Sequence, residues 1–83
     1  MKIYLSSKAD KQLHRLPRQM YQVILNKIEK LERDSFPVGV NKLESRPGWR
    51  IRVGDYRILY TVDQKKKELT ILSVSHRKDA YRY

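Results

Sequence analysis

Arginines surround a predicted turn in the segment GWRIRVGDYRILY, residues 48–60. The turn is expected at residues 54–55, because its glycine tolerates the positive φ that two-residue hairpin turns require. Residues equidistant from such a turn pair directly and share one face of the hairpin, which places Arg52 beside Arg57. Arg50, two residues earlier on the first strand, lies on the same face. The spacing therefore predicts a surface of three neighbouring guanidinium groups.

Such a surface is unfavourable for folding unless something binds to it. Like charges directly opposite each other destabilise a hairpin, by on the order of a few tenths of a kcal/mol. An anion held between Arg52 and Arg57 would reverse the sign of that interaction, and the guanidinium fork matches phosphate oxygens. The sequence thus indicates a phosphate-binding arginine face. The alternative is that these arginines are simply solvated on an exposed sheet.

More cations and two titratable side chains follow the last predicted strand, in SVSHRKDAYRY. His76 can exchange a proton near neutral pH, and Arg77 and Lys78 extend the positive charge. We expect the end of this strand to lie beside the arginine face, so that His76 and Arg77 join it. Tyr81, taken alone, is typical of an exposed aromatic near a chain end. His14, the other histidine, lies on a predicted helix and is expected at the surface.

The composition favours a polyanionic partner. The chain has 83 residues, 19 Lys and Arg against 9 Asp and Glu, and a formal net charge of +10. A field of this sign attracts nucleic acid, although an acidic protein also fits. The length allows one domain, residues 1–83. The chain has no cysteine and no apolar run near the roughly 20 residues of a membrane span, so we expect a cytoplasmic protein without membrane contact.

Hydrophobic periodicity predicts the elements that must position these residues. A short strand over residues 2–6 precedes a helix opened by an N-cap pattern at Ser7 and ended by Pro17. A second helix carries an apolar stripe that consists of Met20, Val23, Ile24, Ile28 and Leu31. Residues 34–48 are predicted to form a loop, and strands are expected at about 49–53, 56–62 and 69–75.

These elements predict an α+β fold, with an N-terminal strand, a helical hairpin and then a three-stranded antiparallel meander, in the order β-α-α-β-β-β. The helices should cover the apolar face of the sheet and leave the arginine face open. The residues expected on the apolar face are Trp49, Ile51, Val53, Tyr56, Ile58 and Tyr60.

The segment WRIRVGDYRILYTVDQKKKELTILSVSHRKDAYRY resembles the RelE/ParE superfamily of bacterial and archaeal toxins, most closely its RelE branch. The resemblance lies in basic residues alternating along a strand, then GDYRILY, a polar turn, an apolar strand and HRKDAY. The N-terminal strand and the helical hairpin broken at Leu-Pro also fit. The resemblance covers essentially the whole chain and implies a single RelE-like toxin domain.

This resemblance implies a toxin of a type II toxin-antitoxin system that cleaves mRNA without a metal or cofactor, in many members in the ribosomal A site. An acidic or amphipathic antitoxin would wrap the toxin and block its site. Carried onto this sequence, the catalytic arginine of the GDYR motif is Arg57 and the arginine after the last strand is Arg77. The terminal tyrosine is Tyr81, and His76 shares the proton-transfer role in this reading.

The basic pair of the family corresponds to Arg50 and Arg52, where lysines are common. Arginine keeps the charge but has no easily deprotonated amine, so a lysine-specific acid or base role is not expected here. With Arg46 and Lys78, these residues are expected to bind RNA. The chemistry implied is attack of a 2′-hydroxyl on the adjacent phosphate. ParE-like relatives, which share the fold but inhibit DNA gyrase without an RNase site, and non-catalytic relatives remain the alternatives.

Overall fold

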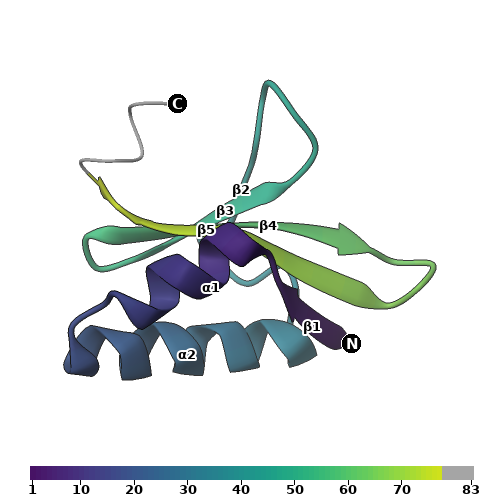
Figure 1. Cartoon of the computed structure of the whole chain (residues 1–83). Coiled ribbons are helices and arrows are strands. Elements are labelled where there is room, and N and C mark those ends of the chain that lie inside the picture. The colour runs from purple at the N-terminus through teal and green to yellow at the C-terminus, as the bar shows by residue number, and fades with distance from the viewer. Residues whose placement is uncertain (78–83) are drawn as a thin grey trace.

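The computed structural model describes residues 1–77 and has a sheet covered on one face by two helices (Figure 1). The five strands lie in the order β1-β5-β4-β3-β2. The elements are β1 (Lys2–Leu5), α1 (Ser7–His14), α2 (Arg18–Arg33), β2 (Asn41–Lys42), β3 (Trp49–Val53), β4 (Tyr56–Asp63) and β5 (Glu68–His76). The predicted α+β class and element order are confirmed. No helix within residues 1–77 is both long and apolar enough to cross a membrane.

The register of the central hairpin agrees with the sequence prediction. Gly54 has a φ of 59° and starts the two-residue turn between β3 and β4. The observed pairs are Trp49 with Tyr60, Arg50 with Leu59, Ile51 with Ile58, Arg52 with Arg57 and Val53 with Tyr56. Apart from Leu59, the partner of Arg50, the apolar members of these pairs belong to the core or pack against it, so the arginines lie on the face away from the helices.

The predicted loop over residues 34–48 contains a short strand that the sequence analysis missed. β2 pairs antiparallel with β3 through Asn41 and Lys42, and the Leu43 N–H closes the hairpin by donating to the Gly48 carbonyl at 3.0 Å. Gly48 has a φ of 133°, and a Cβ there would approach the Tyr60 carbonyl to 3.0 Å. The chain therefore needs glycine at this position to turn back onto the sheet.

The core is built between α2 and the inner face of the sheet. Ile24, Ile28 and Leu31 of α2 are buried, as predicted, but Val23 is 47% exposed. Successive helical residues differ by about 100° in direction, which rotates Val23 away from the sheet when Ile24 faces it. Tyr60 is fully buried, and its hydroxyl donates to the Ser35 carbonyl at 2.6 Å. Burial raises the pKa of Tyr60 to about 12, with a smaller contribution from the negative charge of the nearby Asp34 carboxylate.

One extra residue, Leu72, interrupts the pairing of β5 with β4. Consecutive residues 59 and 60 of β4 pair with Ser73 and Ile71, which leaves Leu72 unpaired. A β-bulge of this kind reverses the alternation of side chains along the strand. Ile71 and Val74 consequently both point into the core, where each is at most 2% exposed. The strand predicted at about residues 69–75 is confirmed, whereas the bulge within it was not predicted.

The backbone of the bulge is held by α1. β1 pairs with β5 only as far as Ile71, and beyond that point side chains from α1 cover the open strand edge. The Ser6 hydroxyl donates to the Leu72 carbonyl at 2.8 Å, and Gln12 Oε1 accepts from the Val74 N–H at 2.7 Å. Buried backbone groups that would otherwise lack partners are thereby satisfied.

Ser6, not Ser7 as predicted, is the N-cap of α1, and its Oγ accepts from the Ala9 N–H at 3.0 Å. Because the same hydroxyl bonds the bulge, Ser6→Ala should lower the free energy of unfolding by about 1–3 kcal/mol. Ser7→Ala, at the exposed first residue of α1, should change it by no more than about 0.5 kcal/mol. Urea unfolding measures both, and equal losses would contradict the double role of Ser6.

Candidate nucleic-acid interface

The arginine face is the side of the sheet that the helices leave uncovered (Figure 1). Since paired residues share a face, the strand register arranges its side chains in rows across the sheet. The row beside the turn is Arg52, Arg57 and Ser75, and the next row is Asn41, Arg50, Leu59 and Ser73. Neither row includes an acidic residue, and the charged members of both rows are all arginines.

The turn at Gly54 and Asp55 brings a third arginine to this end of the sheet. Arg52 Nε donates to the Gly54 carbonyl at 3.1 Å, and the backbone N–H of Arg77 donates to the Asp55 carbonyl at 2.6 Å. Arg52 and Arg77 are exposed, whereas Arg57 is partly buried between them in the sheet. The turn thus holds the backbone of Arg77 and the side chain of Arg52 through two adjacent carbonyl groups, and Arg57 pairs with Arg52 beside it.

Arg46 and Arg50 both line a hollow at the edge of this interface. The loop between β2 and β3 rises from the sheet on the side away from the helices (Figure 1), and a hollow of about 570 Å³ lies between the loop and the sheet. Its polar lining residues are Asn41, Lys42, Glu44, Ser45, Arg46 and Arg50. The hollow adjoins the row next to the Arg52–Arg57 pair, and it has room for a group adjacent to a phosphate bound there.

His76 does not join the arginine face. It pairs with Tyr56, whose side chain packs against the core, so both rings lie on the helix-covered face. Their centroids are 5.2 Å apart with an interplanar angle of 85°. The hollow beside them, about 260 Å³, also contains Gln12, Arg15 and Leu16. The bulge at Leu72 is the physical reason, because uninterrupted alternation from the buried Ile71 would have turned His76 outward.

The acidic side chains of the open face lie at its far end. Asp63 pairs with Glu68 there, and the Tyr4 hydroxyl, on the neighbouring β1, is hydrogen-bonded to Glu68. That hydrogen bond, together with the carboxylate charge, raises the pKa of Tyr4. Lys2 pairs with Glu68 in the same row, and Lys65, Lys66 and Lys67 lie in the adjoining turn, so this end of the sheet carries both charges. In the sequence, the alternation of Tyr4 with Ile3 and Leu5 was the signal that Tyr4 lies on the open face.

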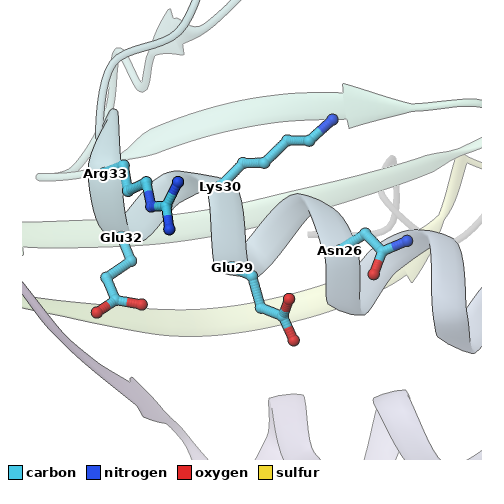
Figure 2. Close-up of a pocket in the computed structure, with 5 residues that line it drawn as sticks. All are labelled: Asn26, Glu29, Lys30, Glu32 and Arg33. Carbon is cyan, nitrogen blue, oxygen red and sulfur yellow. The ribbon is translucent and has the colours of Figure 1, made fainter.

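Another hollow, of about 610 Å³, lies on the exposed surface of α2 and not on the arginine face. Figure 2 shows Glu29 and Glu32 pointing to one side of the helix and Lys30 and Arg33 extending from the other. Asn26 completes its lining. The mixture of both charges on one helix is typical of a solvated surface, so this hollow is not part of the candidate site.

Two predicted site residues, Lys78 and Tyr81, lie outside the described part of the chain. Within residues 1–77, no three His, Asp or Glu side chains are grouped in a way that could hold a metal ion. The arginines of the described site are fixed cations, which can bind a phosphate and stabilise additional negative charge on it.

Comparison with known proteins identifies the family. The family described as "ParE toxin of type II toxin-antitoxin system, parDE" matches residues 3–81. Toxin RelG of Mycobacterium tuberculosis is 30% identical over 82 residues, which cover 96% of this chain and 94% of that protein.

Two solved complexes share the fold. The toxin-antitoxin complex RelBE2 from Mycobacterium tuberculosis matches with a TM-score of 0.81 and 25% identity, over 92% of this chain and 96% of that chain. The archaeal RelE-RelB complex from Pyrococcus horikoshii matches with a TM-score of 0.75 and 32% identity, over 92% and 93%. The chain is therefore a toxin of the type II toxin-antitoxin systems and belongs to the RelE/ParE superfamily.

Proposed function

We propose that this toxin is a metal-independent mRNA endoribonuclease of the RelE type. The observation that carries the proposal is the direct pairing of Arg52 with Arg57 beside the turn that also binds the backbone of Arg77. Two like charges held opposite each other are costly without an anion. A scissile phosphate between the three guanidinium groups would offset that cost and be activated by them.

In the proposed reaction, the 2′-hydroxyl oxygen of one nucleotide attacks the adjacent phosphorus. The new P–O2′ bond forms as the P–O5′ bond breaks, one base removes the 2′-hydroxyl proton, and one acid protonates the departing 5′-oxygen. Arg57 and Arg77, with Arg52, stabilise the charge of the pentacoordinate phosphorane. Tyr81 is our candidate for proton transfer or for stacking on a base, and Arg46, Arg50 and Lys78 bind the neighbouring RNA.

The partners follow from the same charge and from the relatives. The solved relatives include complexes of RelE with RelB, and we propose a cognate antitoxin whose acidic or amphipathic segment wraps this chain. With a net charge of +10, the toxin should associate rapidly with such a segment, in a salt-dependent manner. We further propose that it acts in the cytoplasm on mRNA in the ribosomal A site.

The second candidate function is inhibition of DNA gyrase without RNA cleavage. One observation favours it: the family that matches residues 3–81 is described by its ParE toxin. Shared fold does not decide between the two activities, because a fold can carry different sites. The paired arginines favour the RNA-cleaving candidate, since a protein that only binds gyrase does not require a phosphate clamp.

The arginine clamp can be tested by single substitutions. Arg57→Ala and Arg77→Ala should each reduce RNA cleavage by about 100-fold or more, because each removes a cation that stabilises the transition state. Arg33→Ala, a matched control on the exposed surface of α2, should leave the rate unchanged. Cleavage of message by translating ribosomes is the measurement, with thermal unfolding as the check on fold. Full activity of the Arg57→Ala, Arg77→Ala double variant would refute the clamp.

The products distinguish the proposed chemistry from hydrolysis by water. Cleavage should proceed in EDTA and leave a 5′-hydroxyl on one fragment and a 2′,3′-cyclic phosphate or 3′-phosphate on the other. A message with a 2′-deoxynucleotide at the cleavage position should resist cutting, because the attacking oxygen is missing. Mass spectrometry of the fragment ends reads both results. A 5′-phosphate would identify water as the nucleophile and exclude this mechanism.

The two candidate functions differ in what is damaged in the cell. Expression of the toxin should truncate messages within minutes and should not induce a DNA-damage response, as read by sequencing RNA ends. Tyr81→Phe should slow cleavage more than it lowers thermal stability, because it removes only the hydroxyl proposed to transfer a proton. Intact messages together with broken chromosomal DNA would instead assign the toxin to the ParE branch, while unchanged cleavage by Tyr81→Phe would remove Tyr81 from the site.

A further inference from the structure

His76 occupies an unusual place for a residue next to a candidate catalytic arginine. It is the last residue of β5, and Arg77 follows it directly. Its partner across the strands is Tyr56, the first residue after the Gly54-Asp55 turn. His76 therefore directly precedes Arg77 in the chain, and Tyr56 directly follows Asp55.

Contacts on both sides of these two strands tie the strand end to the turn. On the helix-covered face, His76 and Tyr56 contact edge to face, with centroids 5.2 Å apart, a geometry that aromatic quadrupoles favour. At the next position, the Arg77 N–H donates to the Asp55 carbonyl at 2.6 Å. The adjoining Gly54 carbonyl accepts from Arg52 Nε at 3.1 Å. The turn thus binds both the backbone of Arg77 and the side chain of Arg52. The His76–Tyr56 ring pair lies one residue from the Arg77–Asp55 hydrogen bond on each strand.

We propose that His76 is a positioning residue, which holds Arg77 against the turn through its contact with Tyr56 and does not itself transfer a proton to or from RNA. This inference rests on the proposed function for its activity test. His76 faces α1, in a hollow shared with Gln12, Arg15 and Leu16. The sheet lies between that hollow and the arginine face, so the imidazole has no direct approach to a phosphate bound by Arg52 and Arg57.

The rate of RNA cleavage should therefore depend on the flat ring of His76 and not on proton transfer by that ring. His76→Ala removes the ring and should lower RNA cleavage by about 10- to 100-fold, the loss expected when a catalytic group shifts by about 1 Å. His76→Phe keeps a flat ring against Tyr56 and should restore most of the rate. His14→Ala is the matched control, since His14 also neighbours a tyrosine ring, Tyr21 at 6.2 Å, but lies on the exposed surface of α1. It should cleave like the wild type.

A double-mutant cycle separates positioning from a general loss of stability. If His76 acts through Arg77, then His76→Ala should cost little more once Arg77→Ala is present, because coupled residues are not additive. In an Arg50→Ala background the full cost of His76→Ala should remain. Equal costs in the two backgrounds would show that His76 supports the protein in a general way and would overturn the proposal.

Amide hydrogen exchange tests the same contact without RNA. The Arg77 amide, bonded to the Asp55 carbonyl, should be protected in the wild type and in His76→Phe, and should lose most of its protection in His76→Ala. Unchanged protection in His76→Ala, or an inactive His76→Phe that keeps the protection, would refute positioning, the latter in favour of proton transfer. If the wild type cleaves no RNA, the proposed function fails, while the exchange measurement still decides whether His76 holds Arg77.

Discussion

The bulge at Leu72 is the constraint on which the rest of the structure depends. β5 pairs with β1 on one side and with β4 on the other, so any change in its alternation affects both. The extra residue lets Ile71 and Val74 both enter the core. β1 pairs with β5 only as far as Ile71, and the side chains of Ser6 and Gln12 bond the backbone of β5 at the bulge and just beyond it. Helix α1 is thus fixed to the sheet by hydrogen bonds at the bulge.

The bulge also determines which residues at the end of β5 face the arginines and which face the helices. Before it, the apolar side chains of β5 face the helices. Beyond it, Ser73 and Ser75 share the rows of the arginine face, and His76 turns toward the helices. Small side chains thereby lie next to the arginines, while the larger imidazole packs against Tyr56. A strand without the bulge would bring the imidazole to the open face and turn the two serine side chains toward the helices.

The charge of the open face is not needed for the fold. The core consists of apolar side chains from both helices and the inner face of the sheet, and the arginine rows oppose folding through mutual repulsion. At the other end of the same face, Asp63 and Glu68 lie beside Lys2, which pairs with Glu68, so both charges are present there. The charged residues of the Arg52–Arg57 row are of one sign only, and this row is the electrostatic basis of the proposed site.

The sequence alone was sufficient to predict the features that depend on local chemistry. Gly54-Asp55 specifies a two-residue turn, and the turn specifies every pair of the hairpin, because register is counted outward from it. The Arg52–Arg57 pair was therefore predictable from the position of the turn, as was the apolar stripe of α2 from its spacing, apart from the outward rotation of Val23. Pro17 between two amphipathic segments likewise predicted the helical hairpin.

Only the tertiary structure decided the features that depend on distant partners. The two-residue strand β2 has too little sequence signal of its own and exists because β3 offers it an edge. The apolar residues at positions 69, 71, 72 and 74 are compatible with a bulge in β5. The bulge is bonded by Ser6 and Gln12, which lie more than sixty residues away in the chain, so its presence could not be read from the local sequence. The face on which His76 lies follows from the bulge, because one extra residue reverses every side chain beyond it.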